Sequence, residues 1–206
     1  MVATQLEARG ITDRRVLDAM RTVPRHEFVP ASIRDIAYTD QALAIGHGQT
    51  ISQPYIVALM CQLLEVESHH RVFEVGAGSG YQAALLGQIA AEVYSVDLVP
   101  ELVDAAARLV ERLGYENVHI IAGDGTLGLP EKAPFDRIIV AAAAPDIPPP
   151  LIDQLAPGGR LIAPVGDRFL QRLVVLTRTA EGVQSRNSIG CVFVPLLGRH
   201  GWSSAD

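Results

Sequence analysis

A glycine-rich turn near the middle of the chain limits the possible folds more than any other feature. The short apolar run Arg71–Val75 leads directly into Gly76-Ala77-Gly78-Ser79-Gly80, and Tyr81–Ala90 then has the apolar spacing of a helix. A glycine-rich turn that follows a strand and opens a helix lets a ligand approach the backbone closely. The sequence therefore predicts a strand, a turn and a helix around a ligand site.

Strands and helices continue to alternate beyond this turn. A long amphipathic helix is expected at Pro100–Leu113. Four more strands are expected, at Glu92–Val96, His119–Ala122, Arg137–Ala141 and Arg160–Pro164. Strands that alternate with helices of about 10–15 residues indicate βαβ units and an α/β fold with a doubly wound, mainly parallel sheet. The end of the chain differs, because Leu173–Arg178 and Gly182–Ser185 are expected to pair as antiparallel strands.

The part of the chain before this core is expected to be an N-terminal helical segment. Apolar residues recur at helical spacing over residues 1–30, until two prolines end the pattern. A loop-rich stretch follows. A second helix is then expected at Gln53–Glu65, with Pro54 in its first turn and Ser52 as its N-cap. A chain of 206 residues corresponds to one domain on the basis of about 150 residues per domain.

Charge and hydropathy exclude several classes of protein. The formal net charge is −6, whereas a general nucleic-acid binder needs a basic footprint, so no nucleic-acid partner is expected. No apolar run approaches the ~18–20 residues that span a bilayer. The first residues carry charged side chains throughout, unlike a secretion signal. We therefore expect a cytoplasmic protein with no membrane partner.

The cysteines and histidines show no metal-binding pattern. Cys61 and Cys191 are far apart in the sequence, which fits two reduced thiols. His69 and His70 are neighbours, but the chain contains neither an H-E-x-x-H motif nor a Cys/His ligand spacing. We therefore expect no metal site.

The spacing inside the turn distinguishes two kinds of cofactor. A dinucleotide fingerprint, G-x-G-x-x-G, would place its third glycine at the position that Tyr81 occupies. The chain instead reads G-x-G-x-G, with Glu74 two residues ahead of the first glycine. This pattern resembles the first motif of the class I S-adenosylmethionine-dependent methyltransferases, which implies a Rossmann-like methyltransferase fold. A nicotinamide-dependent dehydrogenase is disfavoured.

Two acidic residues at the next strand ends favour a nucleoside cofactor. Asp97 ends a strand 17 residues beyond Gly80, where a carboxylate can accept two hydrogen bonds from a ribose diol or cap the following helix. Asp124 lies between Gly123 and Gly125, where it can accept a hydrogen bond from an adenine amino group or form an ordinary Asp-Gly turn. The expected cofactor-binding residues are Glu74, Gly76, Gly78, Gly80, Asp97, Gly123 and Asp124.

A segment upstream of the turn makes the resemblance more specific. Ala44–Pro54 reads Ala-Ile-Gly-His-Gly-Gln-Thr-Ile-Ser-Gln-Pro and is similar to the signature of the protein-L-isoaspartate O-methyltransferase family. Four further stretches are similar to that family, namely Val23–Pro30, Ala133–Val140, Leu155–Leu161 and Phe193–Leu196. The resemblance covers residues 4–197. Many methyltransferases share the glycine motif, so residues 48–54 are the discriminating part.

The resemblance implies an activity, a cofactor and a substrate. Enzymes of this family transfer a methyl group from S-adenosyl-L-methionine to the free α-carboxylate of an L-isoaspartyl residue in a damaged protein or peptide, and the ester then collapses to a succinimide. Proteins or peptides that contain isoaspartate are thus the implied partners, and a monomer is expected. By family analogy Ser52 is catalytic. The implied substrate-binding residues are Gln49, Thr50, Ile51 and Ser52.

These implications divide the single domain 1–206 into three parts. Residues 1–65 are expected to form a substrate-side helical segment, 70–165 a cofactor-binding core and 166–206 the C-terminal strands.

The implied methyl transfer needs no general base, because a carboxylate with a pKa of about 4 is ionised at pH 7. Catalysis then depends on holding oxygen, carbon and sulfur in line, an orientation effect of up to ~7–11 kcal/mol.

The residues alone leave several alternatives open. A methyltransferase for RNA is disfavoured by the net charge of −6, and Ala141–Pro145 lacks the Asn/Asp-Pro-Pro-Tyr arrangement of enzymes that methylate an exocyclic amine. A carboxyl methyltransferase for a specialised peptide or another substrate would keep the same pocket. A non-catalytic S-adenosylmethionine-binding module would keep the fold. Some relatives carry Glu, His and Thr where this chain has Asp97, Val57 and Leu197, which affects the expected substrate contacts.

Overall fold

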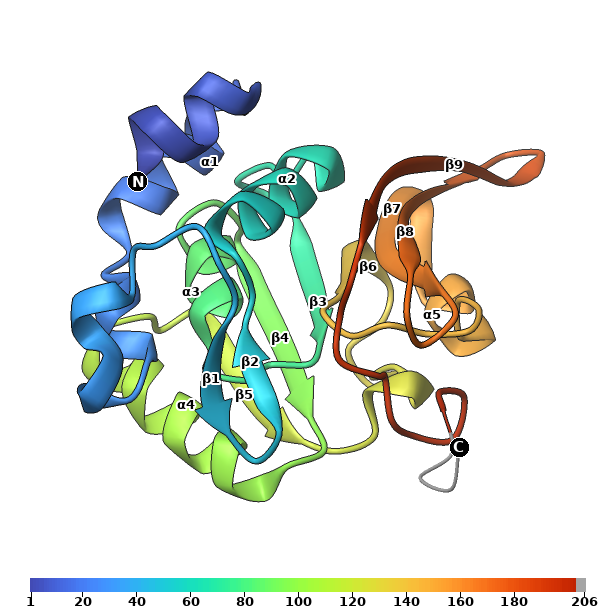
Figure 1. The fold of residues 1–206 in the computed structure, drawn as a ribbon. Coiled ribbons are helices and arrows are strands. Elements are labelled where there is room, and N and C mark those ends of the chain that lie inside the picture. Colours follow the sequence, from blue (N-terminus) through green and yellow to red (C-terminus); the bar gives the residue numbers. More distant parts are fainter. Residues whose placement is uncertain (203–206) are drawn as a thin grey trace.

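The computed structural model describes residues 1–202, which are built around a seven-stranded sheet (Figure 1). Its strands lie in the order β5-β4-β3-β6-β7-β8-β9. They are β3 (Arg71–Val75), β4 (Glu92–Asp97), β5 (Val118–Ala122), β6 (Phe135–Val140), β7 (Leu155–Gly166), β8 (Gln171–Thr179) and β9 (Gly182–Cys191). All pairs from β5 to β7 are parallel, whereas β8 pairs antiparallel with both β7 and β9. The predicted C-terminal hairpin is therefore present, with longer strands than expected.

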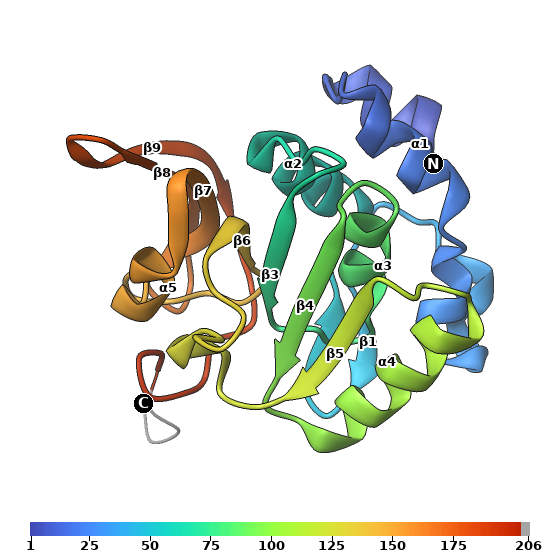
Figure 2. The same cartoon turned by 180° about the vertical axis from the view of Figure 1, so that it is seen from behind.

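Helices lie on both faces of this sheet (Figures 1 and 2). They are α1 (Arg14–Thr22), α2 (Pro54–Leu64), α3 (Tyr81–Gly87), α4 (Pro100–Arg112) and α5 (Pro149–Asp153). Buried residues of α1 to α4 share one hydrophobic cluster with one face of the sheet, and α5 contributes to a second cluster on the other face. The predicted doubly wound, mainly parallel sheet is confirmed. Within residues 1–202, no helix combines the length and the apolar character that crossing a bilayer requires.

The alternation of side chains along β3, the middle one of the five parallel strands, illustrates how the two clusters arise. In β3, Val72 belongs to the first cluster, whereas Phe73 and Val75 belong to the second, as expected for side chains that point to opposite faces in turn. A parallel strand covered on both faces needs apolar residues on both, which explains the nearly continuous apolar run in the sequence. Glu74 is the one charged residue of β3 whose side chain is fully buried.

The structure adds a hairpin to the stretch before α2, which was expected to be loop-rich. Strands β1 (Leu43–Gly46) and β2 (Gln49–Ile51) pair antiparallel there. Gly46 at the end of β1 and the turn residues His47 and Gly48 all have positive φ, and glycine adopts this backbone region without strain. The hairpin was missed because strands this short show too few residues to establish a period of two.

Ser52 is not the N-cap of α2, which corrects the prediction. The N-cap is Gln53, and no side-chain hydrogen bond caps the helix. The Gln53 side chain instead donates to the main-chain carbonyl of Asp40 at 3.0 Å. The helix thus begins at Pro54, one residue later than expected, and the Ser52 hydroxyl is not used to hold its first turn.

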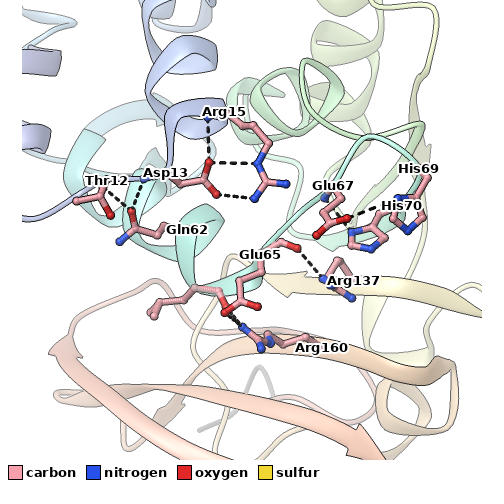
Figure 3. A network of polar contacts seen from close by, with 11 residues as sticks. Thr12, Asp13, Arg15, Gln62, Glu65, Glu67, His69, His70, Arg137 and Arg160 are labelled. Carbon is pink, nitrogen blue, oxygen red and sulfur yellow. Dashed lines mark hydrogen bonds and ion pairs between the residues drawn. The ribbon is translucent and has the colours of Figure 1, made fainter.

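Polar contacts attach the start of the chain to α2, and the end of α2 to the sheet (Figure 3). The side-chain oxygen of Gln62 accepts hydrogen bonds from the backbone N–H groups of Thr12 and Asp13, at 2.7 and 2.9 Å. Beyond the end of α2, the side chain of Arg137 in β6 donates to the carbonyl of Glu65 at 3.1 Å. These contacts position the N-terminal segment over one face of the sheet.

Candidate active site

The candidate site lies where the strand order of the sheet reverses. β3 is the middle one of the five parallel strands, and its neighbours are β4 on one side and β6 on the other. In open α/β sheets, ligands bind at such a point, outside the carboxyl ends of the strands. The carboxyl end of β3 continues into the glycine turn, and that of β6 continues into Ala141 and Ala142. The predicted ligand turn is therefore at the position that the topology favours.

The glycine turn is held closely against its neighbours. Gly76, Gly78 and Gly80 have φ values of +94°, +52° and +83°, a region that residues with a Cβ rarely adopt. At Gly80 a Cβ would also lie 3.2 Å from the Cβ of Ala106 in α4. Close packing and backbone conformation together explain why these positions are glycine.

Two narrow cavities, of about 60 and 70 Å³, flank this turn. Gln49 of the hairpin, Gly76, Asp97 and Ala142 line both of them. The first cavity is lined by eight of the predicted site residues, namely Gln49, Thr50, Ile51, Ser52, Glu74, Gly76, Gly78 and Asp97. Gly80 lines neither cavity and is instead the N-cap residue of α3. The fold thus brings the four predicted substrate-binding residues and most of the predicted cofactor-binding residues to one place.

Glu74 presents a buried carboxyl group to the first cavity. Its Oε2 accepts a hydrogen bond from the Ser95 hydroxyl at 2.5 Å, while its Oε1 has no partner among the described residues. Burial raises the pKa of Glu74 to about 8, with the Ser95 hydrogen bond opposing this rise and the charge of Asp97 adding to it. A buried carboxyl oxygen without a partner is costly, so this group is suited to a cationic or hydrogen-bonding ligand.

Asp97 connects the end of β4 to the glycine turn. Its Oδ2 accepts a hydrogen bond from the Gly78 N–H at 2.8 Å, and its Oδ1 accepts one from the Val99 N–H at 3.0 Å. The N-cap of α4 is Val99, so Asp97 does not itself cap that helix. A carboxylate can accept about four hydrogen bonds, which leaves acceptor capacity for a ribose diol. That contact stays a prediction.

Gly123 and Asp124 do not line either narrow cavity, although the adjacent Gly125 lines the second. Oδ1 of Asp124 accepts from the Thr126 N–H at 2.9 Å, and Oδ2 accepts from the Arg199 N–H at 2.8 Å. Burial opposes ionisation here, but the hydrogen bonds from Thr126 and Arg199 keep the pKa of Asp124 below its ordinary value. The carboxylate therefore holds the C-terminal segment, and the predicted adenine contact stays a prediction.

A larger cavity of about 600 Å³ adjoins the first narrow one. Thr50, Ser52, Ala141 and Val194 line both. Residues 40–42 and 190–194 contribute further walls of the larger cavity. The Ser52 hydroxyl has no hydrogen-bond partner within residues 1–202. Ser52 thus lies where the two cavities meet, with a hydroxyl group available to a ligand.

Two buried polar residues near Ser52 were not predicted. Arg25 is fully buried, and its guanidinium donates to the carbonyls of Ala37 and Ser52 at 2.7 and 2.8 Å. Burial lowers the pKa of Arg25, and the nearby Tyr81 opposes this effect. Gln82 lines the first cavity, and its Nε2 is buried without a partner among the described residues. No periodicity or composition signal marks a buried arginine; only its place in the family-like segment 23–30 singles it out.

The structure also places the two departures from some relatives. Val57 is buried and lines the first narrow cavity. Leu197 is partly exposed and lines the second. Neither residue lines the larger cavity. We call the two narrow cavities beside the glycine turn the narrow crevice. Val57 and Leu197 therefore affect the shape of this crevice more directly than that of the larger cavity.

A separate cluster of possible metal ligands (Figure 3) directly precedes β3, whereas the glycine turn follows that strand. Ligand atoms of Glu67, His69 and His70 lie within 4.8 Å of one another. The Nδ1 of His70 accepts a hydrogen bond from the Glu67 N–H at 2.9 Å, so this imidazole nitrogen already serves the local turn. The length of β3 separates this cluster from the glycine turn, so the three possible ligands do not line the candidate site. That the protein needs no metal stays a prediction.

Comparison with known proteins identifies relatives that match nearly the whole chain. The family model described as protein-L-isoaspartate(D-aspartate) O-methyltransferase matches residues 1–201. A protein-L-isoaspartate O-methyltransferase of Methanoculleus marisnigri is 54% identical over 98% of this chain and 92% of its own length. A protein-L-isoaspartate O-methyltransferase 1 of Syntrophobacter fumaroxidans is 53% identical over 98% of this chain and 94% of its own length.

Solved structures agree with these matches. A protein-L-isoaspartate O-methyltransferase structure superposes with a TM-score of 0.85 at 30% identity, over 95% of this chain and 64% of that chain. A Plasmodium falciparum structure, named a protein-L-isoaspartate O-methyltransferase and solved with S-adenosyl-L-homocysteine, superposes with a TM-score of 0.80 at 28% identity. It covers 93% of this chain and 94% of its own length. With the site geometry and the match over residues 1–201, this chain belongs to the protein-L-isoaspartate(D-aspartate) O-methyltransferase family.

Proposed function

We propose that this chain transfers a methyl group from S-adenosyl-L-methionine to the free α-carboxylate of L-isoaspartyl residues in damaged proteins and peptides. The observation that carries the proposal is the position of Ser52 between the narrow crevice at the glycine turn and the larger cavity. Methyl transfer requires a donor and an acceptor that meet in line at one point. Membership of the family and the names of the relatives support the choice of substrate.

The residues of the crevice fit S-adenosyl-L-methionine. Glu74 would hold its cationic amino acid end, because this carboxyl group has a buried oxygen without a partner beside the cavity. Asp97 would accept hydrogen bonds from the ribose hydroxyls. Gly76 and Gly78 would allow close approach of the backbone. Gly123 and Asp124 lie outside the cavity linings, next to Gly125 of the second cavity, and would face the adenine at that edge. When bound, the cofactor supplies an electrophilic methyl group on a sulfonium.

The larger cavity would receive the isoaspartyl residue. Its α-carboxylate is already ionised at neutral pH, so the protein has no proton to remove. The free hydroxyl of Ser52 would donate a hydrogen bond to one carboxylate oxygen and leave the other to attack. Gln49, Thr50 and Ile51 would complete the wall between donor and acceptor. The contribution of the protein is therefore orientation and exclusion of water, which suits a site with no general base.

Methyl transfer is the only step that the chain must catalyse. The product is a neutral methyl ester next to a main-chain amide. The nitrogen of that amide attacks the ester carbonyl, loses its proton and expels methanol, which yields the succinimide. This ring closure is intramolecular, so it needs no further group from the protein.

The proposal is tested with labelled S-adenosyl-L-methionine and three peptides of one sequence. The first contains isoaspartate, the second aspartate, and the third an isoaspartate whose α-carboxylate is replaced by a carboxamide. We expect base-labile label on the first peptide alone, because only its free α-carboxylate offers the attacking oxygen at the right distance from the chain. If the cofactor binds but no isoaspartyl peptide is labelled, the substrate assignment is wrong. A non-catalytic cofactor-binding module would then be the better description.

A further inference from the structure

Three large apolar side chains are the most exposed of their kind among the described residues, and one of them, Val192, lines the larger cavity. Phe169, Val192 and Leu170 are 86%, 71% and 62% exposed, which are the three highest values among the large hydrophobic side chains of residues 1–202. Phe169 and Leu170 lie between β7 and β8, and Val192 follows β9. Single exposed apolar residues are ordinary, whereas a group of them marks an interaction surface. We call these three residues the apolar rim.

Strand pairing places two residues of the rim, Leu170 and Val192, next to each other, and Phe169 precedes Leu170 in the chain. Gln171 of β8 pairs with Cys191 of β9, and both side chains are buried. Because side chains alternate between the two faces of a sheet, Leu170 and Val192 next to this pair point away from the core together. Leu170 also extends over β9, since a Cβ added at Gly190 would lie 3.8 Å from its Cδ1.

The rim is continuous with the proposed acceptor pocket. Val192 lines the larger cavity together with Gly190 and Phe193, and Ser52 lines the same cavity. A polypeptide that places an isoaspartyl carboxylate at Ser52 therefore carries its neighbouring residues through this cavity and past Val192. The rim is the surface that these neighbours meet.

The chemistry of the acceptor indicates which side chains arrive there. A main-chain α-carboxylate can enter the cavity only if the segment that carries it is locally unfolded. Local unfolding exposes apolar side chains that the native protein buries. We propose that the apolar rim binds an apolar side chain close to the isoaspartate, so that the enzyme favours isoaspartyl sites in locally unfolded, apolar segments of its substrates. This inference rests on the proposed function.

The test uses the full chain and fluorescently labelled isoaspartyl peptides in a Gly/Ser background. One Leu is placed in turn at each of the three positions before and after the isoaspartate. The Kd of each peptide is measured by anisotropy in the presence of S-adenosyl-L-homocysteine, and methyl transfer is measured in parallel. At the best position we expect Leu to lower the Kd about 3–10-fold relative to the all-polar peptide, as partial burial of an apolar side chain allows.

Variants of exposed residues separate the rim from the rest of the site. In the double variant Phe169→Ser, Leu170→Ser the Leu-containing and all-polar peptides are expected to bind with the same Kd. Val183→Ser is the matched control, because Val183 is 52% exposed in β9 but lies outside the rim. This variant is expected to keep the full preference for Leu.

Three outcomes would overturn the inference. The first is a wild-type Kd that does not depend on Leu at any position, and the second is a preference that persists in the double variant. The third is a concentration-dependent dimer in sedimentation experiments that the double variant abolishes, because the rim would then be an interface between two copies of the chain. Absence of methyl transfer to every peptide would contradict the proposed function instead, while the Kd comparison would still decide the role of the rim.

Discussion

The guanidinium of Arg25 donates a hydrogen bond to the main-chain carbonyl of Ser52 at 2.8 Å. The donor is fully buried, and the acceptor belongs to one of the residues that line both the first narrow cavity and the larger one. This bond holds the segment between the hairpin and α2 against the N-terminal part of the chain. Arg25 also places a buried positive charge behind the pocket that we propose for a carboxylate.

We expect Arg25→Met to weaken both folding and peptide binding. The change leaves the carbonyls of Ala37 and Ser52 without these donors, which costs about 2–4 kcal/mol of unfolding free energy at ordinary penalties for unsatisfied buried groups. The KM for an isoaspartyl peptide is expected to rise more than the Kd for the cofactor. Arg25→Lys, which keeps the charge, is expected to recover part of the lost peptide affinity.

Denaturant titration measures the free energy of unfolding, calorimetry the Kd for the cofactor, and steady-state kinetics the KM for the peptide. Arg34→Met is the control, since Arg34 is exposed and its ion pair with Glu27 spans 3.4 Å at the surface. Exposed pairs of this kind contribute about 0–1 kcal/mol. An equal loss of peptide and cofactor affinity in Arg25→Met would show that Arg25 supports the fold alone.

Ser52→Ala is expected to reduce turnover with almost no loss of stability. The Ser52 hydroxyl neither caps α2 nor has another partner within the described residues, so the change in unfolding free energy is expected to stay within about 0.5 kcal/mol. Loss of one hydrogen bond to the substrate carboxylate lowers kcat/KM about 10-fold or more. Ser185→Ala, on the exposed part of β9, is the matched control and is expected to leave both turnover and stability unchanged. Unchanged turnover in Ser52→Ala would remove the catalytic assignment.

Asp97→Ala is expected to weaken cofactor binding and to loosen the glycine turn. The variant loses the acceptors for the Gly78 and Val99 N–H groups as well as the proposed ribose contact. We expect the Kd for S-adenosyl-L-homocysteine to rise about 10–100-fold, because hydrogen bonds to charged groups contribute about 1.5–3 kcal/mol. Isothermal titration calorimetry gives this Kd. Asp104→Ala, on the exposed side of α4, is the matched control, and an unchanged Kd in Asp97→Ala would reject the ribose role.

The buried carboxyl of Glu74 links stability to pH. Burial raises its pKa from 4.5 to about 8. Between these values the folded chain keeps a proton that the unfolded chain has lost, so the free energy of unfolding falls as the pH rises through this window. The contribution of this single group has a slope of at most about 1.4 kcal/mol per pH unit. Glu74→Gln is expected to remove this contribution in urea titrations at pH 5 to 8.

The same group predicts proton release on cofactor binding. A cationic ligand beside Glu74 favours the ionised carboxylate, so binding below about pH 8 is expected to expel up to about one proton. Calorimetry in buffers with different ionisation enthalpies measures this number. A wild-type value that equals that of Glu74→Gln would show that Glu74 does not face the cationic end of the cofactor.

Much of the sheet could be predicted because its elements carry their own patterns. The strand Arg71–Val75 matches the prediction, and α4 ends one residue before the expected end. The strand expected at Arg160–Pro164 proved to be the inner part of a longer β7. The first residues of β7 include a proline and two glycines, which have low strand propensity, so the sequence did not predict that the strand starts there. The small hairpin was missed for the related reason that three or four residues hold no clear period.

The sequence by itself determined the mainly parallel sheet, the glycine turn and the family, because apolar periodicity, glycine spacing and motif order are local properties of a chain. Only the tertiary structure decided that Ser52 joins two cavities instead of capping α2, and that Asp124 holds the segment at Arg199. The bonds from Arg25 to Ser52 and from Arg199 to Asp124 connect residues 27 and 75 positions apart. Such contacts depend on how distant elements pack, and no local pattern encodes that packing.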